Sequence, residues 1–327
     1  VLLSTSILAE NDLYLRDSLT TDVTIQGEFE LVATGGSPRI QEVTTQLLLL
    51  PQNTFQQQIV RQETSGTISD KVTYRWNGGD IGTKTFSYRA TIKTNNQQLK
   101  VTRKIPFPLD ENEIREFEEY LQPTITIDSN NPTIIAKAAE LAEGEDDLFK
   151  VVFKLANWVD ENVRYDLSTL TAETSQKASW VLENREGVCD EMTSLFVAMA
   201  RSLGIPARFV SGISYTTSDL FSSPWQPHGW AEVYLPGTGW VSFDITFGEY
   251  GYVDVTHIKL RDGFDPQEPA TKYEWVARDV DLQASPLDLT ASILAKGQLV
   301  PEDIQLEEEL LSTEVGPGSF NVVKAIV

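Results

Sequence analysis

The sequence predicts an α+β fold in which helices followed by an antiparallel sheet lie between two β-rich regions. Three observations lead to this expectation. Apolar and polar residues alternate over much of residues 1–108, as in half-buried strands. From about Asp110 to Leu203 apolar residues recur every three or four positions, as in amphipathic helices, and strand-like runs return after Pro206. We therefore expect three regions, at residues 1–108, 109–262 and 263–327.

Residues 1–108 are expected to form an antiparallel β-sandwich. Apolar residues occupy every second position in "VTIQGEFEL" (23–31), and the pattern recurs at 86–92. The polar "NNQQ" (95–98) is typical of a turn, and several short strands joined by polar turns favour a sandwich. The opening "VLLSTSILAE" (1–10) is either a first strand or the tail of a signal peptide or membrane anchor.

The middle region, 109–262, opens with helix signals. In "NNPTIIAKAAELAEG", Asn131 is a predicted N-cap, Pro132 suits the first helical position, and Gly144 follows the end. "DDLFKVVFKLANWVDENV" carries a continuous apolar stripe, which predicts a strong amphipathic helix. "DENEIREFEEYL" and "TSQKASWVLENREG" predict shorter helices, the second capped by Thr174 or Ser175.

The strand signals return in "ARFVSGISY", "GWAEVYLPGTGWVSFDIT" and "YVDVTHIKL", so helices are followed by an antiparallel sheet. "PGTG" (236–239) marks a hairpin turn. Residues 263–327 contain further strand-like pieces such as "KYEWVARDVDL", and we expect them to form a separate β-rich C-terminal region, either whole or cut short.

The charge of the chain argues against two kinds of partner. The 48 acidic and 26 basic residues give a net charge of −22. Nucleic acid and anionic membrane surfaces both require a basic face, so we expect neither as a partner. No run of 18 apolar residues occurs, so this chain contains no spanning helix, and membrane anchoring through segments outside it stays open.

The chain has one cysteine and two histidines. It therefore forms no internal disulfide, and without a CxxC pair we expect no zinc site; no cofactor or other metal is predicted. The many Thr and Gln residues and the few Lys residues favour an extracellular or cell-surface protein.

The single cysteine, Cys189, stands immediately before a predicted core-facing helix that ends at Gly204. Unpaired N–H groups at a helix start stabilise a thiolate and can hold the oxyanion of a tetrahedral intermediate. The charges of Asp190 and Glu191 should raise the pKa of the thiol, so a nearby imidazolium is needed for activation. The alternative is a small buried apolar cysteine.

A histidine and an aspartate can meet across the predicted hairpin. His228 stands at an expected loop-to-strand junction, and Asp244 ends the next strand, so the two are nearly equidistant from the turn. A Cys189–His228–Asp244 set is then geometrically plausible, with the carboxylate fixing the imidazole tautomer. Taken singly, the histidine is as easily a polar surface residue and the aspartate a turn cap.

Two segments, "GVCDEMTSLFVAMARSLGIPARFVSG" and "HGWAEVYLPGTGWVSFDIT", resemble the transglutaminase-like superfamily of microbial type, which has a papain-like core. The resemblance implies Cys189 as nucleophile, His228 as base and Asp244 as orienting acid. It implies thiol-dependent acyl transfer on amide or peptide carbonyls of a protein or peptide substrate. With water as acceptor the enzyme is a protease or amidase, and with an amine it is a cross-linking transglutaminase. The alternative is a surface or adhesion module with an inert transglutaminase-like scaffold.

Other residues receive weaker assignments. Trp230, Trp180 and Tyr165 are candidates for the substrate cleft, with core packing as the alternative, and Tyr165, Trp158 and Trp180 are candidates for a second oxyanion donor. We expect Arg208 to pair with a carboxylate such as Glu232. The segment 214–227 is expected to be a polar loop that serves as a lid or rim. His257 is expected to be structural.

Overall fold

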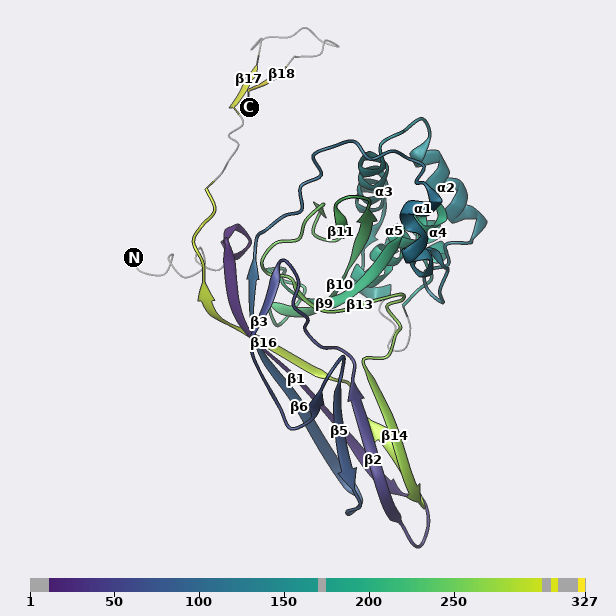
Figure 1. The fold of residues 1–327 in the computed structure, drawn as a ribbon, viewed down its shortest axis with the longest axis vertical. Coiled ribbons are helices and arrows are strands. Elements are labelled where there is room, and N and C mark those ends of the chain that lie inside the picture. Colours follow the sequence, from purple (N-terminus) through teal and green to yellow (C-terminus); the bar gives the residue numbers. More distant parts are fainter. Residues whose placement is uncertain (1–11, 170–174, 302–306, 311–322, 327) are drawn as a thin grey trace.

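The structure is a computed structural model of the chain, and it describes residues 12–169, 175–301, 307–310 and 323–326. The opening segment 1–10, for which a strand or a leader was expected, lies outside these residues. Long strands build one end of the molecule, and helices with a separate sheet build the other (Figure 1).

Two antiparallel sheets form the β end. The first has the strand order β15-β1-β6-β3, and β16 also pairs with β1. The second has the order β14-β2-β5-β4. The bounds are β1 Ser18–Ala33, β2 Arg39–Leu47, β3 Gln57–Thr64, β4 Thr67–Ile68, β5 Val72–Asn77, β6 Gly82–Asn95, β14 Thr271–Arg278, β15 Val280–Ala284 and β16 Asp288–Lys296.

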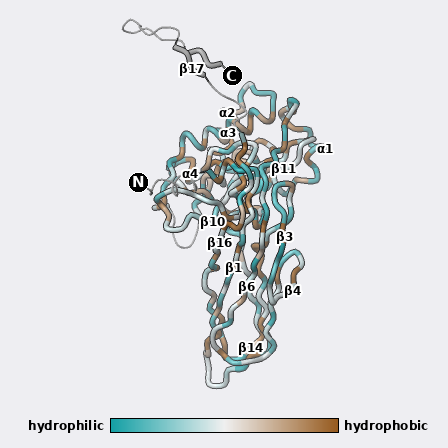
Figure 2. The backbone as a smooth tube through the Cα atoms, turned by 90° about the vertical axis from the view of Figure 1, so that its left-hand side faces the viewer, coloured by the Kyte–Doolittle hydropathy of each residue, from teal (hydrophilic) through white to brown (hydrophobic). Residues whose placement is uncertain are grey.

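The two sheets share one apolar cluster, as the alternating pattern of the strands requires. Val23, Ile25 and Phe29 of β1 are buried, and the ring of Phe29 lies 5.2 Å from that of Trp76 and 5.5 Å from that of Tyr273. Along β1, β6 and β14 the hydropathy changes between neighbouring residues (Figure 2). The buried apolar residues of β1, β2, β5 and β6 therefore belong to one core.

The strands after residue 263 complete these sheets and do not form a separate region. β15 and β16 pair with opposite ends of β1, and β14 pairs with β2. The expected boundary at 262/263 therefore separates strands that hydrogen-bond to strands of residues 1–108. A strand shows the same alternation of apolar and polar residues whether it pairs with a nearby or a distant strand, so the sequence pattern could not reveal these partners. Beyond it, β17 (Glu307–Leu310) and β18 (Val323–Ile326) pair with each other.

The helices lie where the sequence predicts them, with shifts at their ends. Asn131 caps α2 by accepting a hydrogen bond from the Thr133 N–H at 2.9 Å. The helix near 178 begins after Lys177 without a side-chain cap, so Ser175 is not the cap, and Thr174 lies outside the described residues. The bounds are α1 Glu111–Ile114, α2 Pro132–Ala142, α3 Leu148–Asn162, α4 Ala178–Asn184 and α5 Cys189–Ser202, with short 3-10 turns at Leu13–Leu15, Arg115–Leu121 and Leu167–Thr169.

Helix α5 is the central element of this half. Every residue from Glu191 to Arg201 is buried, because α2, α3 and α4 cover the helix on one side and β9 and β10 on the other. The expected apolar stripe is present, and small residues such as Ala198 and Ala200 let the remaining faces pack closely as well. A helix buried on all sides holds its first residue, Cys189, in a fixed place.

The third sheet, which belongs to the helical half, has the order β12-β11-β10-β9-β13. Ile213, Tyr215 and Trp225 of this sheet belong to the same apolar cluster as the core of the β end, so the two halves are packed together. The bounds are β9 Ala207–Tyr215, β10 Trp225–Leu235, β11 Gly239–Asp244, β12 Glu249–Tyr250 and β13 Ile258–Gly263, and a short parallel pair joins β7 (Arg164–Tyr165) to β8 (Glu186–Gly187).

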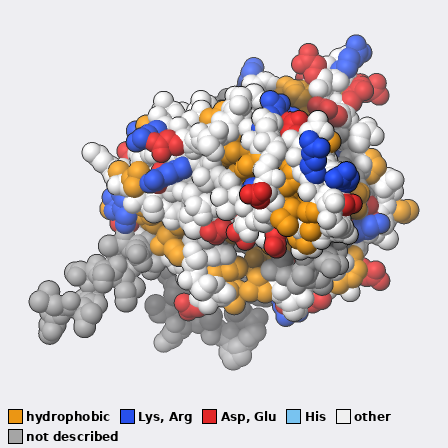
Figure 3. Space-filling model, turned by 90° about the horizontal axis from the view of Figure 1, so that it is seen from below, with side chains coloured by type: hydrophobic (Ala, Val, Ile, Leu, Met, Phe, Trp, Pro, Cys, Tyr) orange, Lys and Arg blue, Asp and Glu red, His pale blue; other side chains and the backbone are white. Residues whose placement is uncertain are grey.

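One face of the molecule carries side chains of both charges. Seen from the lower end of Figure 1, acidic and basic side chains are interspersed among apolar ones (Figure 3). None of the helices within the described ranges is long and apolar enough to cross a membrane.

Candidate active site

Cys189 is the first residue of α5, as the sequence predicts, and its side chain is half-buried. Its Sγ lies 3.6 Å from Asp190 Oδ1. Glu191 closes the start of the helix: its carboxylate accepts hydrogen bonds from the Val188 N–H at 3.0 Å and from the Thr169 hydroxyl at 2.7 Å. The carboxylate therefore holds the helix start, which carries the thiol, in place.

The surroundings of Cys189 favour the neutral thiol. Burial raises the pKa of the Cys189 thiol well above its usual range, and the charge of Asp190 acts in the same direction. A hydrogen bond with the Gly229 backbone opposes the shift without cancelling it. The expected effect of Asp190 is thus present, and the helix start alone does not activate the sulfur.

The hairpin β10–β11 brings His228 to Asp244. Leu235 pairs with Gly239 and Ala231 with Phe243, so one further step sets Asp244 opposite Trp230, with His228 two residues along the strand. His228 Nε2 lies 2.5 Å from Asp244 Oδ2, and both side chains are buried. The structure corrects one detail. β9 extends to Tyr215 and β10 begins at Trp225, so His228 lies inside β10 and the loop expected at 214–227 spans only 216–224.

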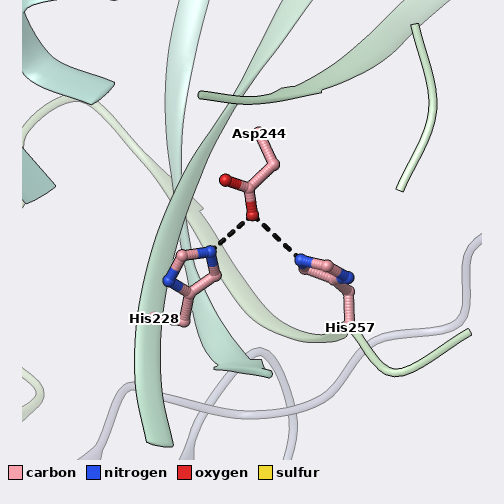
Figure 4. A group of neighbouring side chains, drawn as sticks. All are labelled: His228, Asp244 and His257. Carbon is pink, nitrogen blue, oxygen red and sulfur yellow. Dashed lines mark hydrogen bonds and ion pairs between the residues drawn. The ribbon is translucent and has the colours of Figure 1, made fainter. Parts of the chain in front are cut away.

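Asp244 is held from both sides (Figure 4). Its Oδ1 accepts hydrogen bonds from the Thr246 N–H at 2.9 Å and the Phe247 N–H at 3.1 Å. Its Oδ2 faces His228 and also His257, whose Nε2 lies 2.9 Å away. Burial alone would raise the pKa of Asp244, but the charge and hydrogen bond of His228 and the hydrogen bond of His257 outweigh it and hold the pKa below its usual range.

Sequence reasoning missed the position of His257. Its side chain is fully buried, and its Nδ1 lies 3.4 Å from Asp254 Oδ1 and 3.8 Å from Glu249 Oε2. Burial opposes the charged form, yet the hydrogen bonds to Asp244 and Asp254 raise the pKa of His257 well above its usual range. The spacing Asp-x-x-His in "DVTH" was the one signal in the sequence that could have drawn attention to it.

One cavity of about 690 Å³ joins the thiol and the imidazole. Cys189 and His228 both line it, together with Asp190, Tyr165 and Phe247. Leu49, from the segment after β2, and Leu289, from β16, form part of its wall, so the β end contributes to it. A molecule bound in this cavity could therefore contact both side chains.

The three candidate cleft aromatics separate in the structure. Tyr165 lines the cavity beside Cys189. Trp230 is buried behind the histidines: its ring lies 6.0 Å from that of His228 and 5.3 Å from that of His257, and it borders a different cavity of about 30 Å³. Trp180 packs against the apolar core and is absent from the lining of the large cavity among the described residues.

Trp158, the other candidate oxyanion donor, stacks with the Arg185 guanidinium, whose central carbon lies 4.3 Å from the centre of the indole ring. Arg208 pairs with Glu232 at 2.6 Å, as the sequence predicts, and with Asp262 at 2.7 Å. Trp158 therefore has a packing role, and Arg208 is held by ion pairs.

Two groups of side chains bring nitrogen and carboxylate oxygen atoms within 4.8 Å of one another. One is His228, Asp244 and His257, and the other is Glu249, Asp254 and His257. Hydrogen bonds and ion pairs within each group already account for these approaches. The geometry of the described residues therefore gives no reason to place an ion in either group.

The central helix, the sheet beside it and the position of the cysteine define a class. Residues 135–245 match the model of the transglutaminase-like superfamily. Among curated proteins, the chain is 26% identical over 177 residues to the uncharacterized protein YebA of Bacillus subtilis, a match over 50% of this chain and 23% of that protein.

It is also 28% identical over 136 residues to the uncharacterized protein ML0607 of Mycobacterium leprae, over 41% of this chain and 47% of that protein. The matched part thus spans less than half of either relative. Among solved structures, the fold is similar to that of a candidate cysteine protease from Cytophaga hutchinsonii, with a TM-score of 0.60 and 16% identity over 94% of this chain and 98% of that one. This likeness concerns the fold, and it extends over the β end as well as the helical half.

Proposed function

We propose that the protein is a thiol-dependent enzyme that transfers acyl groups from amide or peptide carbonyls through Cys189, His228 and Asp244. The observation that carries the proposal is the shared cavity: Cys189 and His228 both line it, and His228 is hydrogen-bonded to the fully buried Asp244. The superfamily match of residues 135–245 supports it.

The geometry suggests how the groups share the reaction. Asp244 occupies Nε2 of His228, which leaves Nδ1 to exchange a proton with the sulfur. The sulfur attacks the carbonyl carbon, and the C–N bond breaks as the leaving amine takes the proton from His228. The resulting thioester is then cleaved by water or by a second amine, which forms the new C–O or C–N bond and releases the sulfur.

The start of α5 supplies the oxyanion stabilisation in this proposal. The first N–H groups of a helix have no intrahelical partner, and Cys189 is the first residue of α5. Tyr165 lines the same cavity, and burial raises the pKa of its phenol, which therefore stays protonated as a second donor. Trp158 and Trp180 are not needed in this role.

The test compares the unmodified protein with Cys189→Ala and His228→Ala on a panel of peptide amides, with and without a primary amine. We expect both variants to lose at least about a thousandfold in rate, since removing a member of such a set costs about 10³-fold or more. Release of the carboxylic acid identifies hydrolysis, and the amide of the added amine identifies transfer. An activity that persists in Cys189→Ala would end the proposal.

One observation favours a second candidate function, an inert scaffold in a surface or adhesion protein: burial and Asp190 together raise the pKa of the Cys189 thiol. The rate at which iodoacetamide labels Cys189, the single cysteine, separates the two. Labelling below neutral pH that disappears in His228→Ala supports the enzyme, and labelling no faster than that of an ordinary buried thiol supports the scaffold. We place either function outside the cell or at its surface, with a protein or peptide as partner.

A further inference from the structure

We propose that His257 is a positioning residue for the acyl-transfer site, a buried imidazolium that fixes Asp244 in the orientation His228 requires. The inference rests on the proposed function and extends the chain of contacts from Cys189 and His228 through Asp244 to His257 and Asp254.

The first argument concerns protons. A neutral imidazole has one N–H donor and one bare nitrogen. His257 faces carboxylate oxygens at both ends, Asp244 Oδ2 at 2.9 Å and Asp254 Oδ1 at 3.4 Å, and an ionised carboxylate can only accept. Both ring nitrogens therefore need a proton, and the ring is a cation held between two anions.

The second argument concerns charge. Burial raises the pKa of Glu249 to about 8, so this carboxyl is mostly protonated at neutral pH. Asp244 and Asp254 then carry two negative charges against the one positive charge of His257. Two carboxylates facing one imidazole favour its charged form, so they stabilise the positive charge of His257. The charged and titratable groups around His257 are Asp244, Asp254, Glu249 and His228, with Glu232 and Lys259 beside the small cavity that His257 lines.

The third argument concerns orientation. Asp244 Oδ1 is held by two backbone N–H groups and Oδ2 by two imidazoles, so the carboxylate has no freedom to rotate. Phe247 packs edge-on against both rings, at 5.1 Å from His228 and 5.2 Å from His257. Removing His257 leaves Oδ2 with a single partner and opens space beside it.

The first experiment uses the unmodified protein. With only two histidines in the chain, the ring ¹⁵N signals can be assigned by comparison with His228→Ala. We expect both nitrogens of His257 to carry a proton at pH 7. A bare nitrogen on His257 at this pH would overturn the inference whether or not the enzyme is active.

The second experiment measures the pH dependence of Cys189 alkylation in His257→Gln, which can keep a donor toward Asp244 but loses the charge. Losing a nearby positive charge makes the thiolate less stable, so the profile should move to higher pH, with labelling about threefold or more slower on its rising part. His257→Leu, which also loses the donor, should react more slowly still. Thr256→Val is the matched control, since the buried Thr256 hydroxyl has no hydrogen-bond partner among the described residues.

A folded His257→Gln with the profile of the unmodified protein would refute the positioning role. This outcome is distinct from failure of the proposed function. In that case Cys189 of the unmodified protein would itself label as an ordinary thiol, and His228→Ala would leave its rate unchanged.

Discussion

At the scale of single residues, the proposed nucleophile Cys189 lies beside an unfavourable charge. Asp190 follows Cys189 directly, and its Oδ1 is 3.6 Å from the sulfur. Burial raises the pKa of Asp190, whereas the charge of His228 lowers it. In the proposed mechanism the thiol therefore depends on His228 for activation, because Asp190 opposes its ionisation.

Asp190→Asn tests this balance. The variant removes a negative charge from beside the sulfur, so the pKa of Cys189 should fall and alkylation near neutral pH should be up to about tenfold faster. The measurement is the pH–rate profile with iodoacetamide. Asp219→Asn, an exposed change in the 216–224 loop, is the control and should leave the profile unchanged. A slower reaction in Asp190→Asn would show that the carboxylate assists the thiol.

At the scale of elements, the site depends on how closely β10 approaches the start of α5. Gly229, next to His228, has no side chain where one would collide: a Cβ there would lie 2.4 Å from the Phe209 ring and 2.6 Å from Asp190 Oδ1. The Thr193 hydroxyl also donates to the Gly229 carbonyl at 3.1 Å. The strand and the helix are therefore in direct contact at the residues that bring the imidazole and the thiol into one cavity.

We expect Gly229→Ala to push β10 away from α5. The overlap should lower the free energy of unfolding by about 1–3 kcal/mol and reduce activity further than the stability loss explains, since small displacements of reacting groups cost large factors in rate. Urea unfolding and the alkylation rate of Cys189 provide the two readouts. Gly36→Ala, where a Cβ meets nothing within 4 Å, is the control. Unchanged values for Gly229→Ala would mean that the contact is looser than described.

At the scale of the whole molecule, the β end forms part of the wall of the large cavity. Its sheets combine strands from the first hundred residues with strands that follow residue 263. β14, β15 and β16 pair with β2 and β1, and Leu289 of β16 lines the large cavity. Most of the cavity lining is apolar. The charged side chains of Arg261 and Glu268 also line it, but they form hydrogen bonds with backbone groups. We propose that this wall selects a peptide with a bulky apolar side chain near the reacting carbonyl.

Leu289→Asp tests the contribution of the β end. The variant should weaken kcat/KM for a peptide with Phe or Leu at the selected position by about tenfold, and much less for the matching Ala peptide. Leu294→Asp lies on the same strand, is 58% exposed and should leave both substrates unaffected. Equal losses on both peptides would argue that Leu289 supports the fold and not the selection.

The buried acid behind the site also predicts how stability depends on pH. Because burial raises the pKa of Glu249 from 4.5 to about 8, the folded state binds more protons than the unfolded state between these values. Its contribution is therefore fully present below about pH 4.5 and is lost as the pH rises toward 8. His257 acts in the same direction, since its pKa is also raised.

Glu249→Gln should remove the contribution of Glu249 to this pH dependence of stability. Between pH 5 and pH 8 its free energy of unfolding should rise relative to that of the unmodified protein by about 1 kcal/mol per pH unit. Urea unfolding at several pH values measures the difference, with Asp219→Asn as control. A constant difference across this range would show that Glu249 is ionised in the folded protein.

Local periodicity and the motif sufficed for the helix that carries Cys189, for the hairpin near 236–239 and for the pairing of Arg208 with Glu232, because each depends on contacts within one element or between neighbouring strands. Three features required the tertiary structure: the return of β14–β16 to the first two sheets, the burial of Trp230 behind the site, and the placement of His257 against Asp244. Each joins segments by packing and hydrogen bonding at a distance along the chain, and a pattern of apolar positions shows which face is buried without showing what covers it.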